Sequence, residues 1–180
     1  QDNVRWHDGQ PLTAEDVKFS IERSIAKIKG YAGKWLKSIE EIKALDSATV
    51  QITLKNPQLS VLGALTVPGY GGGAIVPKHV LDADPKALET SVVGTGPFKL
   101  TRYEKGVEYA LERNDDYFVD GRPHMDGITT IPISDASTRL TAFVSGRVDV
   151  INFDTPMTPQ EARILDGRKA NSTVPFDRLN

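Results

Sequence analysis

The chain has 180 residues and a formal net charge of −2, with 39% hydrophobic and 26% charged residues. These values are ordinary for a globular domain and differ from those of a disordered chain. The near-neutral charge offers no overall attraction for nucleic acid or an anionic membrane surface. No apolar run is long enough to cross a bilayer, and the absence of cysteine excludes disulfides and thiolate metal sites within this sequence.

The start of the chain predicts a turn followed by a long helix. Asp8-Gly9 is a standard turn pair after a short extended stretch at residues 3–7. Thr13 is the expected N-cap of a helix that runs to Gly30. Two acidic residues follow Thr13, where the helix dipole favours negative charge, and apolar side chains then recur at helical spacing.

A hairpin and two short helices are expected next. Apolar and polar side chains alternate over 49–54, and this segment is predicted to pair with 39–45 across a short turn. Short helices are predicted at 59–65 and 77–81. The glycine-rich stretch between them, residues 68–73, must be a loop because so many glycines destabilise a regular element.

The second part of the chain predicts strands and one amphipathic helix. Residues 98–103 and 107–113 are expected to form a hairpin. A strand at 128–133, a helix at 135–145 and a strand at 148–151 follow in close succession. This order predicts a right-handed βαβ unit in a parallel sheet.

Motifs for catalysis and metal binding are not found in the sequence. It holds no Gly-x-Ser-x-Gly elbow, no His-Glu-x-x-His and no calcium-loop spacing of acids. The three histidines, His7, His79 and His124, lie far apart, and a single histidine beside a turn is more often structural than a metal ligand. The Gly-x-Gly-x-x-Ala pattern at 69–74 lacks the strand and helix of a dinucleotide site. We therefore expect no enzyme, no cofactor and no metal.

One stretch is rich in basic residues. It could form an anion-binding patch for an acidic partner, which would make the chain an interaction domain. A solvated helix face is the more usual fate of such a run. The basic side chains of this stretch are Lys18, Arg23, Lys27, Lys29, Lys34 and Lys37.

Several motifs follow one another along the chain. They are Val4-Arg5-Trp6-His7-Asp8-Gly9-Gln10-Pro11-Leu12-Thr13-Ala14-Glu15-Asp16-Val17-Lys18-Phe19-Ser20-Ile21-Glu22-Arg23, the predicted hairpin segment 48–56, Ile75-Val76-Pro77-Lys78-His79, Gly94-Thr95-Gly96-Pro97-Phe98-Lys99-Leu100, Leu111-Glu112-Arg113-Asn114-Asp115-Asp116-Tyr117-Phe118, Asp135-Ala136-Ser137-Thr138-Arg139-Leu140 and Ser145-Gly146-Arg147-Val148-Asp149-Val150. In this order they resemble the family 5 extracellular solute-binding proteins, the dipeptide, oligopeptide and nickel type receptors of ABC importers. Each motif alone is modest, but the ordered set covers nearly the whole chain.

The resemblance implies a fold. It is an α/β architecture with an α+β subdomain, a fragment of the periplasmic-binding-protein type II fold, in which two lobes close on a ligand. Residues 1–93 would form the α+β subdomain inserted in lobe I, and residues 94–180 would form part of the lobe I sheet. The second lobe would be absent from this chain, so we expect the fragment not to bind ligand tightly by itself.

The resemblance also implies a function. The chain would belong to a substrate-binding receptor that captures a peptide-like or other polar small solute and delivers it to the permease subunits of an ABC importer. Its location would be periplasmic or at the cell surface, with membrane contact only through the transporter or an upstream lipid anchor. Peptide, sugar, opine-like and nickel-chelate ligands remain open. The alternatives are an interaction domain using the basic stretch, or an enzyme domain.

Two places are expected to supply ligand-facing side chains. The segment Gly30-Tyr31-Ala32 resembles the Tyr-Ala stretch after the first helix of peptide receptors, where a tyrosine faces the cleft. Tyr31 is therefore the first candidate, with Trp35 nearby. Packing in the core or at a subdomain interface is the alternative for both aromatic residues.

The other candidates lie in predicted loops. In open α/β sheets ligands sit beyond the carboxyl ends of strands, which favours Asn152, Phe153 and Asp154 after the strand at 148–151. Asn152 and Asp154 could pair with ligand amides or amines, or they could lie in a solvated turn. Tyr70, in the glycine-rich loop, is the last candidate.

Overall fold

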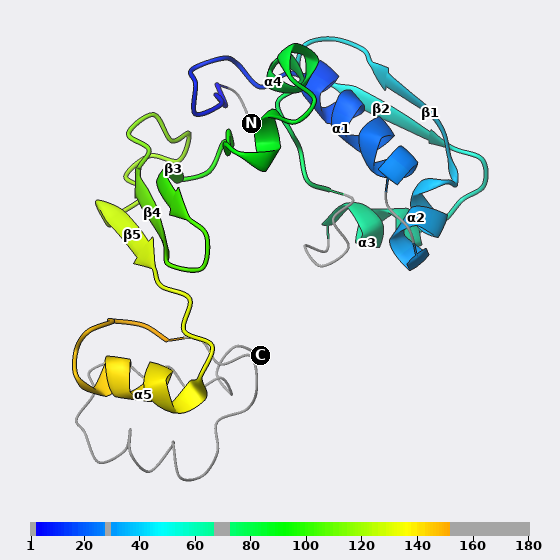
Figure 1. Ribbon diagram of the computed structural model, residues 1–180. Coiled ribbons are helices and arrows are strands. Elements are labelled where there is room, and N and C mark those ends of the chain that lie inside the picture. The colour runs from blue at the N-terminus through cyan, green and yellow to red at the C-terminus, as the bar shows by residue number, and fades with distance from the viewer. Residues whose placement is uncertain (1–2, 28–29, 67–72, 152–180) are drawn as a thin grey trace. The chain divides into compact units, whose positions relative to one another are not determined.

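The computed structural model describes residues 3–27, 30–66 and 73–151, which belong to two compact units (Figure 1). The first unit is Gln1–Thr130 and the second is Ile131–Asn180. Helices and two antiparallel sheets build the first unit. Among the described residues, none of the helices combines the length and the apolar composition needed to cross a membrane.

Helix α1, Ala14–Lys27, confirms the predicted long helix and lies along the β1–β2 hairpin (Figure 1). Its buried face carries Ala14, Ser20, Ile21 and Ser24, which recur at helical spacing. A separate helix, α2, spans Gly30–Leu36, where the sequence predicted none. Two glycines weaken the helical propensity of this segment, so the buried Leu36 at its end is what favours the helix.

The core of the first unit lies between α1, α2, α3 and the β1–β2 hairpin. Leu36 is 0% exposed and stands at its centre. Trp35, its neighbour on α2, is half-buried and packs against the same cluster. The buried core residues are Ile21, Leu36, Ile39, Ile42, Val61 and Ala64.

The predicted first hairpin is confirmed. Strands β1, Ile39–Ala44, and β2, Val50–Leu54, pair antiparallel. The Asp46 carboxylate closes the turn between them by accepting hydrogen bonds from the backbone N–H groups of Ala48 and Thr49, each at 2.8 Å. These bonds, the one from Ala48 foremost, hold the pKa of Asp46 below its ordinary value.

Two short α-helices confirm the predictions for the next segment. Helix α3 is Ser60–Thr66, and α4 is Lys78–Ala83. The buried Pro77 occupies the N-cap position of α4 rather than its first turn. A 3-10 turn, η2, follows at Ala87–Glu89.

The second sheet has the strand order β3-β4-β5 and is antiparallel throughout. Its strands are β3, Phe98–Glu104, β4, Glu108–Arg113, and β5, Gly127–Thr130. The predicted hairpin at 98–113 is therefore confirmed. Gly106 has a φ of +78° at the tip, a backbone conformation that favours glycine. Arg102 forms ion pairs with Glu104 and Glu108 at 3.3 and 3.2 Å.

The described part of the second unit contains helix α5, Ala136–Val144, as predicted. The expected strand at 148–151 was wrong, because these residues form no strand in the structure. A strand exists only through hydrogen bonds to a neighbour, and the described part of this unit contains no partner strand. The parallel pairing expected of a βαβ unit is accordingly not found among the described strands.

Asp135 is the N-cap of α5, and its lowered pKa leads us to expect that the stability of this helix depends on pH. Hydrogen bonds from the Thr138 hydroxyl, the Ser137 hydroxyl and the Thr138 N–H lower the pKa of Asp135 to about 2. Because this folded-state pKa lies below the ordinary 3.8, the charged cap stabilises α5 fully above about pH 4 and is lost as the pH falls toward 2. Cα chemical shifts of residues 136–144 should therefore move toward coil values over this range.

The matched variant for this prediction is Asp135→Asn. Asparagine caps helices about as well as aspartate but does not titrate. Its α5 shifts should stay constant between about pH 4 and pH 2. Identical pH courses in the two proteins would show that Asp135 does not control the helix.

Candidate functional site

A buried carboxylate ties the start of α1 to the start of α4. Asp16 is 5% exposed. Its Oδ2 accepts hydrogen bonds from the Thr13 N–H at 2.9 Å and the Thr13 hydroxyl at 3.2 Å, and its Oδ1 accepts from the Lys78 N–H at 3.0 Å. One turn further along, the buried Ser20 hydroxyl accepts from the Val76 N–H at 2.9 Å. Two motifs that lie about sixty residues apart are thus joined by side chains of one helix face.

The N-terminal turn is closed by its own backbone. The Gly9 N–H donates to the Trp6 carbonyl and the Trp6 N–H donates to the Gln10 carbonyl, both at 2.8 Å. Gly9 has a φ of +88°, which a glycine adopts without strain. The turn predicted at Asp8-Gly9 is confirmed. Trp6 is 3% exposed, so its buried side chain fixes this turn to the rest of the first unit.

His7 binds this turn to the segment that leads into β3. Its backbone N–H donates to the Gly94 carbonyl at 2.8 Å. Its ring Nδ1 accepts a hydrogen bond from the Gly94 N–H at 3.2 Å, and its Nε2 lies 3.1 Å from the Gly96 carbonyl oxygen. We call residues 91–97 the linker. The half-buried His7 therefore holds the linker at three points.

Asp8 connects the same turn to α4. Its Oδ2 lies 2.7 Å from Nε2 of His79, and the ring of Trp6 contacts the His79 ring edge-on with centroids 6.4 Å apart. Burial opposes the ionisation of Asp8. Hydrogen bonds from His79 and the Gln10 N–H, together with the attraction of the His79 ring, outweigh it and hold the pKa of Asp8 below its ordinary value.

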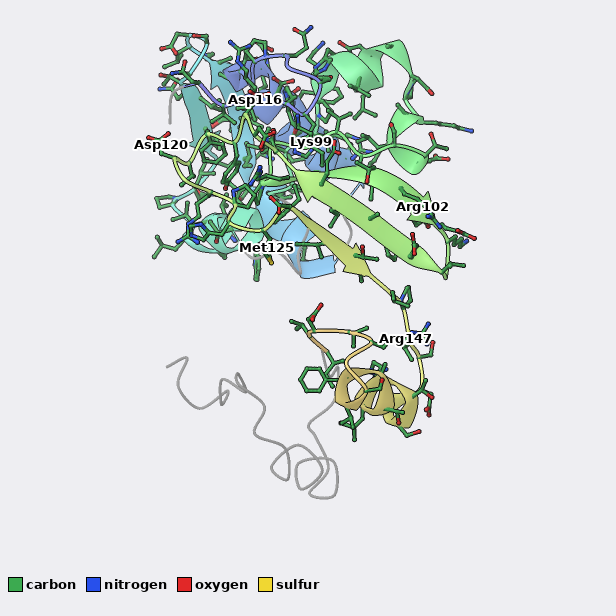
Figure 2. The ribbon with its side chains drawn as sticks, turned by 90° about the vertical axis from the view of Figure 1, so that its left-hand side faces the viewer. Lys99, Arg102, Asp116, Asp120, Met125 and Arg147 are labelled. Carbon is green, nitrogen blue, oxygen red and sulfur yellow. The ribbon has the colours of Figure 1, made fainter. Side chains whose placement is uncertain are left out.

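Asn114 extends the network beyond the linker. It is 2% exposed, and its side-chain N–H donates to the same Gly96 carbonyl at 3.1 Å. Its side-chain oxygen accepts from the Asp116 N–H at 3.3 Å, which fixes the start of the loop between β4 and β5. Figure 2 shows Asp116, Asp120 and Met125 along this loop.

The contacts of this network are hydrogen bonds. Its partners are mostly backbone N–H and carbonyl groups, which are satisfied within the protein. In residues 3–27, 30–66 and 73–151 no three histidine or acidic side chains are grouped so that they could hold a metal ion. The arrangement fixes the geometry of α1, α4 and the linker relative to the start of β3.

Sequence reasoning did not find these contacts. The resemblance contained all of the residues involved, but as separate motifs in chain order. His7, Asp16, Ser20 and Asn114 pair with backbone groups that any residue could supply. A usable signal was that small polar residues, Asp16 and Ser20, stand on the apolar face of a predicted helix.

The predicted ligand-facing residues are distributed as follows. Tyr31 lies on α2, one turn before Trp35. Trp35 is partly buried and packs against the core of the first unit. The remaining candidates, Tyr70, Asn152, Phe153 and Asp154, lie outside the described residues.

Three basic residues of the 18–37 stretch lie on α1, and they do not share one face of this helix. Lys18 and Arg23 are separated by about 140° around the helix axis. Lys18 has Glu15 and Glu22 as neighbours one turn away on either side. Lys27 lies one turn after Arg23 on the same face, which is the face opposite Lys18. The positive charge of this helix is therefore divided.

An open groove of about 520 Å³ lies against the β3–β4 face of the first unit. Segment 88–92 forms its other wall. The rings of Tyr103 and Tyr109 stand side by side in it, with centroids 5.1 Å apart. Its apolar lining suits contact with another apolar surface better than recognition of a charged group.

The comparison with family models gives one match over almost the whole chain. The model described as "Bacterial extracellular solute-binding proteins, family 5 Middle" matches residues 1–176. The match includes the turn at Trp6, the α4 start, the linker and Asn114, which together form the network described above.

Individual relatives agree with the family match. The chain is 33% identical over 163 residues to the oligopeptide-binding protein AppA of Bacillus subtilis, covering 86% of this chain and 29% of that protein. The structure of AppA in complex with a nonapeptide superposes with a TM-score of 0.68 at 32% identity, covering 82% of this chain and 30% of that one. The chain thus spans about 29% of the length of these curated relatives.

Two further solved structures carry different ligands. The PBP AgaA from A. tumefaciens R10, in complex with agropinic acid, has a TM-score of 0.73 at 34% identity, covering 81% of this chain and 29% of that one. NikZ from Campylobacter jejuni, in complex with Ni(L-His), has a TM-score of 0.68 at 29% identity, covering 82% of this chain and 29% of that one. The same architecture therefore occurs in proteins solved with a nonapeptide, with agropinic acid and with Ni(L-His).

Proposed function

Because the chain belongs to the family 5 bacterial extracellular solute-binding proteins, we propose that it forms part of a receptor that captures a polar small solute for an ABC importer. The observation that carries this proposal is the match of residues 1–176 to the family, together with the likeness to solved binding proteins. The receptor would bind its solute without altering it and present it to the permease subunits.

The proposed mechanism is closure of two lobes around the solute. Closure removes a polar solute from water and replaces its hydration with fixed hydrogen-bonding groups. The binding equilibrium shifts toward the closed form only through contacts that exist in that form. The hydrogen-bond network around His7, Asp8 and Asn114 would hold the elements of one lobe in a fixed arrangement during closure.

We propose a peptide-like solute as the first candidate. AppA of Bacillus subtilis, an oligopeptide-binding relative, supports this choice, and its solved complex contains a nonapeptide. The side chains proposed to face the solute are Tyr31, Trp35, Tyr70, Asn152, Phe153 and Asp154. The proposed location is the periplasm or the cell surface, in keeping with a family named as extracellular.

A chimera with AppA tests the proposal. The segment of AppA that aligns with this chain is replaced by residues 1–180, and nonapeptide binding is measured by isothermal calorimetry. We expect the chimera to bind the peptide with an affinity within about a hundredfold of that of AppA, because the replaced segment would contribute only part of the contacts. The isolated 180-residue chain should bind at least a thousandfold more weakly, a difference of about 4 kcal/mol.

Substitutions in the chimera separate the proposed site from the fold. Tyr31→Ala should weaken peptide binding by about tenfold, the loss of one good contact. Lys34→Ala, an exposed change on the same helix, should leave binding unchanged. A chimera with native circular dichroism that binds no peptide would contradict the peptide proposal, and hydrolysis of the peptide would contradict the receptor proposal.

A further inference from the structure

The hydrogen bonds of His7 fix its proton. The Gly94 N–H can only donate, so Nδ1 must carry a lone pair and no proton. The Gly96 carbonyl can only accept, so Nε2 must carry the proton. The contacts therefore require the neutral imidazole in one tautomer. A second proton on Nδ1 would place two N–H groups against each other at 3.2 Å.

The ring has little freedom to avoid that conflict. The backbone N–H of His7 is bonded to the Gly94 carbonyl, which keeps the two residues in register. A Cβ placed on Gly94 would lie 3.3 Å from Cε1 of His7, which shows how closely the ring and the linker approach. A charged ring must then turn away or displace the linker.

The charged groups near this contact do not neutralise such a proton directly. Residues 91–97 carry no ionisable side chain. Arg5 donates to the Gly9 carbonyl, Asp8 pairs with His79 of α4, and Asp116 contacts Asn114 through its backbone N–H. Of these charged residues, Asp8 is the acid whose side chain contacts a second histidine, His79. A proton on the His79 ring would face the Asp8 carboxylate, whereas a second proton on the His7 ring would face the Gly94 N–H.

We propose that His7 is a proton-sensitive clamp on the linker, closed when the ring is neutral and released by acid. The clamp fixes the position of the linker, which connects α4 and η2 to β3. Asn114 keeps one donor on the Gly96 carbonyl after release, so the linker loosens at Gly94 first. The device requires no ligand and is independent of the identity of the solute.

Hydrogen exchange of the Gly94 amide in the 180-residue chain tests the clamp. When the pH is lowered from roughly 8 to roughly 5, the protection of Gly94 should fall by about tenfold, as expected for one lost hydrogen bond. The Leu45 amide, bonded to the Thr49 carbonyl at 2.9 Å in the first hairpin, is the internal reference. Its protection, corrected for intrinsic exchange, should stay constant.

Two variants assign the effect to one ring. His7→Gln can accept and donate hydrogen bonds but does not titrate, so its Gly94 protection should not change with pH. His79→Ala removes the contact with Asp8 and should retain the pH dependence of Gly94. A pH course in His7→Gln equal to that of the wild type would overturn the proposal.

Nitrogen NMR of the unmodified chain gives a test that needs no variant. At neutral pH the ¹⁵N shift of His7 Nδ1 should be that of an unprotonated ring nitrogen, and that of Nε2 should be that of a protonated one. On acidification the Nδ1 shift should change together with the protection of Gly94. A protonated Nδ1 at neutral pH, or equal pH courses for Gly94 and Leu45, would refute the clamp.

Discussion

Replacing Leu36 with alanine should lower the free energy of unfolding of the first unit by about 3 kcal/mol. Leu36 is 0% exposed and lies at the centre of the core formed by α1, α2, α3 and the first hairpin. Truncation removes buried apolar surface and leaves a cavity that the surrounding helices fill incompletely. Because this side chain is also what favours helix α2, the loss should include unwinding of Gly30–Leu36.

Urea unfolding followed by tryptophan fluorescence measures this effect. The chain has two tryptophans, Trp6 and Trp35, and both lie in the first unit, so the signal reports on that unit. The control is Leu62→Ala, the same chemical change on α3 at a side chain that is 60% exposed. It should alter the free energy by less than about 0.5 kcal/mol. Equal effects of the two changes would contradict the packing described for Leu36.

Replacing Asp16 with alanine should lower the free energy of unfolding by about 3 kcal/mol. The change removes the acceptor of three hydrogen bonds and leaves the N–H groups of Thr13 and Lys78 unpaired at partly buried positions. A buried donor without a partner costs more than the ordinary hydrogen bond contributes. The contact between the starts of α1 and α4 should be lost with the carboxylate.

Amide exchange distinguishes a local loss of the contact between α1 and α4 from unfolding of the whole unit. Amide exchange should show faster exchange at Lys78, while the hairpin amide of Leu45 keeps its protection until the whole unit unfolds. Glu15→Ala removes an exposed carboxylate of the same helix turn and serves as the matched control. Unchanged exchange at Lys78 in Asp16→Ala would show that the carboxylate does not hold α4.

The sequence predicted elements where local pattern and local packing coincide. The alternation over 49–54 and the helical spacing after Thr13 produced the first hairpin and α1, because each of these elements buries one face with a fixed period. The same reasoning failed at Gly30–Leu36, where two glycines disfavour a helix that core contacts stabilise. It failed again at 148–151, where a β-type pattern lies without a partner strand among the described residues.

The amino-acid sequence by itself determined the family and most of the alternation of helices and hairpins, since periodicity and ordered motifs are properties of the chain. Only the tertiary structure decided that the motifs at Trp6, Pro77, Gly94 and Asn114 meet. The physical reason is that their contacts join side chains to backbone N–H and carbonyl groups, which every residue except proline carries in full. No pattern of side chains can therefore specify in advance which distant backbone group His7 or Asp16 will bind.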